Sequence, residues 1–378
     1  MGIKILHTAD YHIGMTFDGY GNRAEELAQA RVDVLDRLVE AGNHAGCDLL
    51  VISGDMFDRV SVAQSRVQEA VEKLKDFSGK AVLILPGNHD YLNERSGLWD
   101  AVESALPDHG IILKETAPLS LAPFGLPEVV VYPGPCPERT SGENAISWIC
   151  DQQMQDEKVS LGVAHGSLEG VSPDFEGRYY PMNRSQLAES GIDLWLLGHT
   201  HIPYPDPEEG ILGNIFYAGT PEPDGMDCHH LGSCWIIDVD SEGVSSGERL
   251  SRGKFRFEDQ QTQVLDTHQL QELIESYQDR SDTFLRLKLE GWIPRQDYEK
   301  YIRSGQNLLR SRLSEGVYHL ELILDELHPQ VDGQVIDEEF TEGSFPHRLL
   351  KEVEANGDTQ TLQTAYQLIK EVQENEAE

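Results

Sequence analysis

Short runs of apolar residues alternate with amphipathic segments along the first two thirds of the chain. In 60–74, for example, apolar residues recur every three or four positions, the spacing that gathers them on one face of a helix. Apolar strands that alternate with such helices predict a layered α/β core whose sheets are covered on both faces. The strands are expected at 4–10, 48–55, 81–87, 110–115, 128–134, 160–166, 193–199 and 215–220, and the helices at 22–44, 61–78, 97–106 and 183–190.

The pattern changes after the last of these strands. Three further strand-like segments, CWIIDVD, GERLS and KFRFED, are expected to close the first sheet in antiparallel fashion. Residues 262–328 then alternate strands with helices, one of them over 294–313, and two amphipathic helices follow at 345–355 and 359–376. The sequence therefore predicts a large domain over 1–260, a small αβ domain over 261–330, and an acidic linker with a helical tail over 331–378.

The composition is that of an ordinary globular protein, with 39% hydrophobic and 8% aromatic residues. No apolar run reaches the ~18–20 residues that span a bilayer. The opening MGIKILHTADYH reads as a first strand and lacks the apolar core of a secretory leader. Five scattered cysteines without a CxxC pair are typical of a reducing compartment. We therefore expect a cytoplasmic protein with no membrane association.

The net charge of −36 bears directly on the choice of partners. The chain has 66 acidic and 30 basic residues. Proteins that bind nucleic acids generally carry a basic surface, because neutralising phosphates releases counterions. A chain this acidic should repel DNA at long range unless its charges are segregated or metal ions offset them locally. The excess of acidic residues could reflect a cytoplasm of high salt concentration or a basic partner, and the composition does not distinguish the two.

Polar residues that can bind a metal ion follow several of the predicted strands. In open α/β sheets ligands bind beyond the carboxyl ends of the strands, so these residues should share one site. A single Asp or His in this place is usually a turn former. Many carboxylates and imidazoles crowded together are costly unless a cation neutralises them, which favours a metal site. The residues are Asp10, His12, Asp55, Asp58, Asn88, His89, His165, His199 and His201.

The residue types indicate the kind of metal. A mixed set of Asp, His and Asn without a thiolate suits Mn²⁺ or Fe²⁺, with Zn²⁺ as a further candidate. The set is too large for one ion and fits two ions that share a bridging carboxylate. Two ions ~3.5–4 Å apart are a frequent arrangement for phosphoester hydrolysis, because they activate water and neutralise the developing charge.

The motifs TADYH, SGDMFD, PGNHD, VAHGS and LGHTH, in this order, resemble those of the calcineurin-type metallophosphoesterase superfamily. The resemblance covers residues 3–220. Longer segments, including LHTADYHIG, LPGNHDY and YAGTPEPDG, are similar to those of bacterial DNA repair exonucleases of the SbcD and YhaO type, relatives of the Mre nuclease. The resemblance implies an α/β fold with a metallophosphoesterase β-sandwich flanked by helices, and a small αβ capping domain at 261–330.

The resemblance also implies a role for each polar residue. Asp10, His12 and His201 would bind one metal ion, and Asn88, His165 and His199 the other, with Asp55 bridging the two. His89 would stabilise the transition state or protonate the leaving oxygen, and Asp58 would orient it. Histidine suits this role because imidazole exchanges protons near neutral pH. Asp90 is expected only to shape the turn.

The function implied by this resemblance is that of a Mn²⁺-dependent DNA exonuclease acting on DNA ends. The acidic composition favours an alternative, a phosphodiesterase or phosphatase of the same fold that acts on another phosphoester. Asp90 argues against a protein phosphatase, a group that typically has Glu there. A second alternative is a non-catalytic scaffold, although the complete ligand set and His89 speak against it.

Partners follow from the same resemblance. In the family, a helical segment beyond the cap binds the base of a coiled-coil ATPase of the SbcC or YhaN type, and the helices at 345–355 and 359–376 occupy that place. They could equally pack on their own domain. A homodimer through 61–78 and 97–106 is expected. In 261–330, Arg286, Lys288 and the segment 310–313 would form either a basic strip for DNA or ordinary surface ion pairs.

Overall fold

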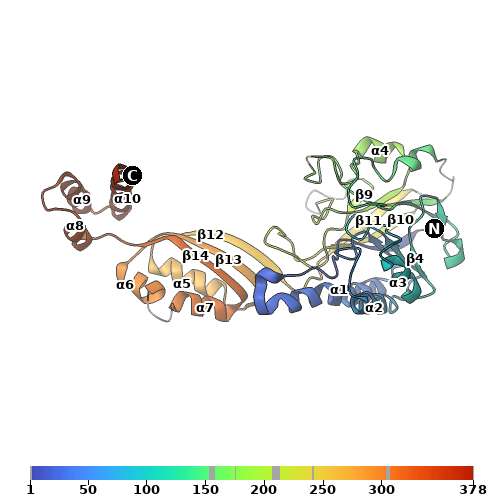
Figure 1. Ribbon diagram of the computed structural model, residues 1–378, viewed down its shortest axis with the longest axis horizontal. Coiled ribbons are helices and arrows are strands. Elements are labelled where there is room, and N and C mark those ends of the chain that lie inside the picture. The colour runs from blue at the N-terminus through green and yellow to red at the C-terminus, as the bar shows by residue number, and fades with distance from the viewer. Residues whose placement is uncertain are drawn as a thin grey trace. The chain divides into compact units, whose positions relative to one another are not determined.

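The chain folds into two compact units, Met1–Arg256 and Phe257–Glu378. Figure 1 shows the computed structural model as a ribbon. The structure describes residues 2–152, 158–174, 176–206, 213–240, 242–303 and 307–377.

Two sheets form the centre of the first unit. One has the strand order β11-β10-β1-β2-β3-β4 and the other β5-β6-β7-β8-β9. Strands β1 to β4 and β6 to β9 pair in parallel, while β10, β11 and β5 join antiparallel. The strands are β1 (Ile3–Thr8), β2 (Leu49–Ser53), β3 (Ala81–Leu85), β4 (Gly110–Ile112), β5 (Leu119–Ser120), β6 (Val129–Gly134), β7 (Val159–His165), β8 (Leu194–Gly198), β9 (Ile215–Tyr217), β10 (Cys234–Asp240) and β11 (Gly243–Leu250).

Apolar side chains hold the two sheets against each other. Ile5 and Val51 of the first sheet pack in one buried cluster with Val163 and Leu196 of the second. The other face of the first sheet packs against three helices, and that of the second sheet against Leu187 of α4. The sequence prediction of a layered α/β sandwich flanked by helices is confirmed (Figure 1). The helices are α1 (Ala24–Ala45), α2 (Gln64–Leu74), α3 (Leu98–Ala105) and α4 (Arg184–Glu189).

The second unit contains a three-stranded sheet in the order β12-β13-β14. Strands β13 and β14 pair in parallel, and helices α5 and α7 cover the sheet through buried residues such as Leu270 and Leu313. Its elements are β12 (Arg256–Val264), α5 (Thr267–Ser276), β13 (Arg280–Ile293), α6 (Arg295–Tyr298), α7 (Leu308–Gly316), β14 (Val317–Pro329), α8 (Gly333–Glu339), α9 (Phe345–Ala355) and α10 (Thr359–Ala377).

Two expectations about this unit are wrong. The segment KFRFED does not close the first sheet, because β12 pairs with β13 and the buried Phe257 ring stacks on Phe284 at 4.9 Å. The single helix expected over 294–313 is interrupted: α6 continues as a π-helical turn over Glu299–Arg303, residues 304–306 lie outside the described residues, and Asn307 is non-helical with φ of 37°. Asn307 starts α7 afresh, since its side chain accepts a hydrogen bond from the backbone N–H of Arg310.

Helices α8, α9 and α10 pack on one another around a small apolar core that includes Ile336, Leu350 and Leu362. The apolar stripes predicted for α9 and α10 are therefore buried only in part. Phe345 and Val372 of those stripes are 70% and 57% exposed.

The basic residues of β13 do not form a strip free for DNA. Arg286 pairs with Asp259 and Glu321 at 3.2 and 2.8 Å. Lys288 lies 2.8 Å from both Glu290 and Glu326. Arg286 and Lys288 thus form ordinary surface ion pairs, the alternative that the sequence left open, and such exposed pairs add little to stability.

No helix within the described parts of the chain is both long and apolar enough to cross a membrane. All five cysteines are free thiols.

Candidate metal centre

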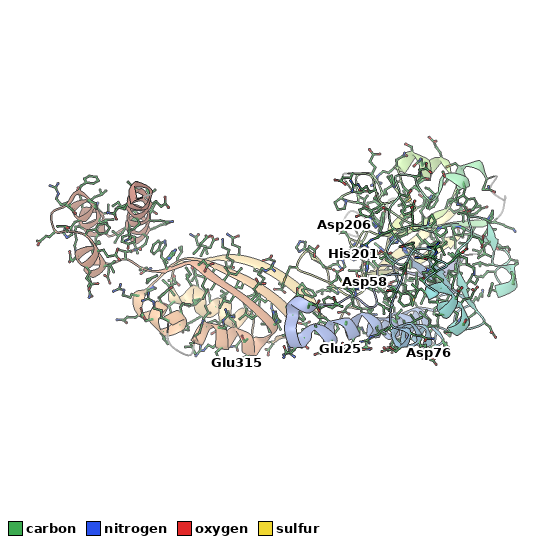
Figure 2. All side chains as sticks on the ribbon, viewed as in Figure 1. Glu25, Asp58, Asp76, His201, Asp206 and Glu315 are labelled. Carbon is green, nitrogen blue, oxygen red and sulfur yellow. The ribbon has the colours of Figure 1, made fainter. Side chains whose placement is uncertain are left out.

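The loops that follow β1, β2, β3 and β8, together with His165 at the end of β7, bring the nine sequence-predicted site residues together. Ligand atoms of three overlapping groups lie within 4.8 Å of one another. His201 and Asp58 of this cluster are labelled in Figure 2. The groups are Asp10 with His12 and His201, His12 with Asp55 and His89, and Asp10 with Asp55 and His165.

In the first group, two imidazole nitrogens point at each other. His12 Nε2 and His201 Nε2 lie 3.1 Å apart. His201 Nδ1 donates to Asp224 Oδ2 at 2.8 Å, so its Nε2 carries the lone pair when the ring is neutral. When two imidazole nitrogens bind the same metal ion, each at about 2.1 Å, the distance between them is close to the distance found here. The positions of His12 and His201 therefore suit a shared cation.

A second group gathers around the side chain of Asn88. Its Oδ1 lies 2.9 Å from His165 Nε2 and 3.1 Å from His199 Nδ1. His165 Nδ1 donates to the backbone carbonyl of Ser53 at 2.9 Å, which fixes the ring with Nε2 toward the cluster.

Asp55 lies between the two groups. Its Oδ2 is 3.3 Å from His165 Nε2 and 3.7 Å from His12 Nε2. Its Oδ1 accepts the backbone N–H of His89 at 2.8 Å. One carboxylate therefore faces histidines of both groups, as a bridging ligand must.

His89 is oriented by the backbone of Asp58. Its Nδ1 lies 3.0 Å from the carbonyl oxygen of Asp58. The Asp58 carboxylate instead pairs with Arg59, at 2.6 Å, and lies 3.8 Å from His12 Nδ1. The structure thus places Asp58 beside His89, but the contact is made by the main chain. The neighbouring Asp90 accepts the backbone N–H groups of Gly87 and Phe57, so its carboxylate shapes the turn.

Two residues that sequence reasoning did not assign support the metal centre. Arg31 of α1 is 1% exposed and donates to the carbonyl oxygens of Asp10 and Tyr11 at 3.1 and 2.6 Å. Asp224 holds His201. Both carried a signal in the sequence, since Arg31 interrupts the apolar stripe of α1 and Asp224 lies near the end of the segment YAGTPEPDG.

The backbone is strained at four of the candidate metal ligands. Asp10, His12, Asp55 and His199 all have positive φ, at 57°, 45°, 52° and 105°. Non-glycine residues rarely adopt this region, and such strain, roughly 1–3 kcal/mol each, concentrates at functional sites where the surrounding structure enforces it. This backbone conformation accompanies the convergence of these side chains on the cluster.

Glycine is needed where the loops approach each other most closely. A Cβ on Gly87 would lie 2.3 Å from both the backbone nitrogen and Oδ1 of Asp55. We expect Gly87→Ala to cost about 1–3 kcal/mol of stability by overpacking and to weaken metal binding, because Asp55 must shift. Thermal unfolding and metal titration measure both effects. Gly19→Ala is the control, because a Cβ at residue 19 would meet nothing within 4 Å. Equal thermal stability and equal metal affinity of the two variants would contradict the prediction.

Burial and neighbouring charges shift the pKa values of the ligands. Burial raises the pKa of Asp10 to about 6. Burial opposes the proton on His165, but the charge of Asp55 and their hydrogen bond outweigh it and raise the pKa of His165 to about 9. Burial lowers the pKa of His199 to about 3 and that of His12 well below its usual value. His12 and His199 are therefore neutral at pH 7, the form that binds metals.

Metal binding should release protons and weaken as the pH falls. At pH 7 the metal-free protein holds a proton on His165, and below about pH 6 it holds a second on Asp10. Ligands must lose these protons, and the hydrogen bond to Asp224 also raises the pKa of His201 against the effect of burial. We therefore expect at least one proton to be released at pH 7 and the affinity to fall steadily as the pH drops from 9 to 6. Calorimetry in buffers of different ionisation enthalpy measures the release. A pH-independent affinity would contradict the prediction.

Comparisons with known proteins identify the family. The family model of the calcineurin-like phosphoesterases matches residues 3–203. The chain is 26% identical over 217 residues to the uncharacterized metallophosphoesterase YhaO of Bacillus subtilis, which is 53% of this chain and 48% of that protein. It is 26% identical over 265 residues to the DNA double-strand break repair protein Mre11 of Methanopyrus kandleri, which is 64% of this chain and 55% of that protein.

A shorter match, 34% identical over 91 residues, is to the SbcD component of the nuclease SbcCD of Bacillus subtilis and covers 23% of this chain and 22% of that protein. A solved structure, TT1561 of Thermus thermophilus, aligns with 66% of this chain and 99% of that one at 11% identity and a TM-score of 0.40, a likeness too weak for a fold argument. The matches span about half the length of the first two relatives. Because the family model covers more than half of the 378 residues and includes the loops of the cluster, the chain belongs to the calcineurin-like phosphoesterase family.

Proposed function

We propose that the chain is a two-metal phosphodiester hydrolase, and more narrowly a Mn²⁺-dependent exonuclease that acts on DNA ends. One observation carries the proposal. Residues from five separate segments, Asp10 and His201 at the extremes, converge on one largely buried cluster of carboxylates and imidazoles. Crowding these groups together costs free energy, and divalent cations bound among them would offset that cost.

In this proposal Asp10, His12 and His201 hold one ion, and Asn88, His165 and His199 the other. Asp55 bridges them, in keeping with its distances to His12 and His165. When bound, two divalent ions supply an activated water molecule and neutralise charge on the phosphate. Mn²⁺ is favoured by the mixed oxygen and nitrogen ligands, with Fe²⁺ or Zn²⁺ as alternatives.

His89 is proposed to give a proton to the leaving oxygen. With Nδ1 donating to the Asp58 carbonyl, its Nε2 is the nitrogen available to the substrate. The His12 ring meets it edge to face at 4.7 Å and holds it beside the cluster. The backbone contact to Asp55 ties its position to that of the proposed bridging ligand.

DNA as substrate is supported by the matches to Mre11 and to SbcD. The net charge of −36 and the ion-paired residues of β13 favour the alternative, a phosphodiesterase acting on another, smaller phosphoester. The third candidate, a scaffold without catalysis, has no observation in its favour, because the complete ligand set and His89 are present.

The remaining parts are proposed to serve the same function. Residues 261–330 would act as a capping domain. The tail 331–378 would bind a coiled-coil ATPase of the SbcC or YhaN type, to which Phe345 and Val372 offer exposed apolar side chains. A homodimer would form through the helices at 61–78 and 97–106. The cytoplasm is the proposed location.

Hydrolysis assays distinguish the candidates. The Mn²⁺-loaded chain is expected to hydrolyse bis(p-nitrophenyl) phosphate, and to shorten linear duplex DNA when its ATPase is present. Hydrolysis of the small diester without any shortening of DNA would instead support the alternative, a phosphodiesterase that acts on a smaller phosphoester. No hydrolysis of either, by protein that has bound two equivalents of Mn²⁺, would end the enzymatic proposal.

A further inference from the structure

His7 is a buried polar residue between the two sheets of the first unit, and the proposed metal centre does not use it. Its side chain is 0% exposed and lies on the same side of β1 as Ile5, which packs in the apolar interior. Burial lowers the pKa of His7 to about 3, although the nearby backbone of Leu197 opposes this shift, so the imidazole is neutral at pH 7. Its Nδ1 has no hydrogen-bond partner among the described residues. Burying such a group costs free energy that an aliphatic side chain would not, so its presence needs an explanation.

The imidazole lies against both sheets at the end where they carry the candidate metal ligands. Its Nε2 is 3.0 Å from the hydroxyl oxygen of Ser53, the last residue of β2 in the first sheet. The ring also lies near the backbone of Leu197, in β8 of the second sheet. The backbone of His7 is fixed, because it pairs with Val51 of β2 and with Trp235 of β10. His7 is therefore a rigidly held polar group between two sheets that pack mainly through apolar side chains.

Ser53 links His7 to one of the candidate ligands. The carbonyl of Ser53 accepts the hydrogen bond from His165 Nδ1 at 2.9 Å, and this contact leaves His165 Nε2 facing Asn88 Oδ1. The surroundings leave little room for movement. A Cβ on Gly198 would lie 2.0 Å from the Ser53 carbonyl oxygen, and a Cβ on Gly54 would lie 2.1 Å from His165 Nδ1. A shift of Ser53 would therefore displace the imidazole of His165.

We propose that His7 is a positioning residue of the metal centre. Its hydrogen bond with Ser53 fixes the carbonyl that orients His165, and so sets the geometry of the ion site to which His165 belongs. The other proposed ion site is held by Arg31 and Asp224, so it should depend far less on His7. This inference rests on the proposed function, because it takes two bound ions as given, and it adds a residue outside the ligand set that acts on one of them.

The test measures how tightly the full chain binds each of two Mn²⁺ ions. Electron paramagnetic resonance of the free Mn²⁺ during a titration gives both dissociation constants. His7→Leu fills similar space without a polar atom. We expect it to weaken the binding of one ion about tenfold, the lower end of the loss that follows removal of an outer hydrogen-bond partner. The other dissociation constant should change little, which a general loss of stability would not produce.

Three further variants test whether the effect depends on the hydrogen bond. Ser53→Ala removes the other partner and should weaken the same ion to a similar extent, and it replaces His7→Leu if that variant does not fold. The double variant should bind no more weakly than either single variant, because both substitutions remove the same contact. His7→Gln places an amide near the position of Nε2 and should recover most of the affinity.

Val131→Ala is the matched control. Val131 is 0% exposed and belongs to the apolar cluster between the sheets, on β6, a strand whose end carries none of the candidate ligands. The loss of two methyl groups there should lower thermal stability. It should leave both Mn²⁺ dissociation constants unchanged.

The outcomes separate this inference from the proposed function. If folded His7→Leu and Ser53→Ala bind both ions as the wild type does, if their effects add in full, or if Val131→Ala weakens binding as much, His7 does not position the metal centre. The hydrolase then still stands if the wild type cleaves bis(p-nitrophenyl) phosphate. If the wild type binds fewer than two Mn²⁺ ions, or binds two and cleaves nothing, the proposed function itself fails. Selective weakening of one ion, with recovery in His7→Gln, supports the inference.

Discussion

The variant His89→Gln is expected to lose kcat by about 10²- to 10⁴-fold, the usual contribution of a general acid. Glutamine can accept and donate hydrogen bonds but cannot transfer a proton at neutral pH. The backbone N–H of residue 89 would still donate to Asp55 Oδ1, now at 2.8 Å, so the proposed bridging ligand should stay in place. Mn²⁺ affinity should therefore change little while turnover collapses.

Kinetics on bis(p-nitrophenyl) phosphate, with metal content measured in parallel, check this prediction. His268→Gln is a matched control, because His268 lies on α5 with its side chain 78% exposed. A second variant, Asp58→Asn, should have a far smaller effect than His89→Gln, since Asp58 touches His89 through its carbonyl and not its carboxylate. An unchanged kcat in His89→Gln would show that the proton comes from elsewhere.

The substitution Arg31→Met is expected to lower stability by about 3–5 kcal/mol, as removal of one member of a buried charged network does. The guanidinium is 1% exposed and also donates to the carbonyl oxygen of Glu222 at 3.0 Å and to Thr220 Oγ1 at 3.2 Å. Methionine fills similar space but leaves the backbone carbonyls of Asp10 and Tyr11 without this donor. The first metal-binding loop would lose its anchor.

Urea unfolding in the absence of metal measures the stability, and titration with Mn²⁺ measures the affinity, which should also fall. Lysine keeps the positive charge but lacks the planar arrangement of donors in the guanidinium. The stability and the Mn²⁺ affinity of Arg31→Lys should therefore lie between those of the wild type and of Arg31→Met. Arg303→Met is the control, because the Arg303 side chain is 67% exposed and forms a surface ion pair with Glu299, one helical turn away, at 3.1 Å. If Arg31→Met and Arg303→Met lower the free energy of unfolding by the same amount, Arg31 does not anchor the loop after β1.

The positions of the proposed metal ligands could be predicted from the sequence because each one follows or ends a strand. A buried strand is a short apolar run, and parallel strands carry their carboxyl ends to one edge of the sheet. Asp10 after β1, Asp55 after β2 and Asn88 after β3 are therefore expected at one edge of the first sheet. His199 follows β8 of the other sheet, so the packing of the two sheets brings it to the same place.

The supporting residues could not be predicted in the same way. Arg31 is 20 residues from the carbonyl of Tyr11 and 191 from that of Glu222, and no local pattern links these positions. The same holds for the charges of β13. Arg286 and Lys288 looked available in the sequence, and only the pairing of β13 with β14 showed that Glu321 and Glu326 neutralise them.

The sequence by itself determined the four helices and most strands of the first unit, the family, and the side chains at the strand ends, because each depends on short-range apolar periodicity or on contiguous motifs. The tertiary structure decided which groups hold those side chains and how the backbone is bent at Asp10 and Asp55. These features arise from contacts between residues far apart in the chain, whose geometry exists only once the sheets have packed.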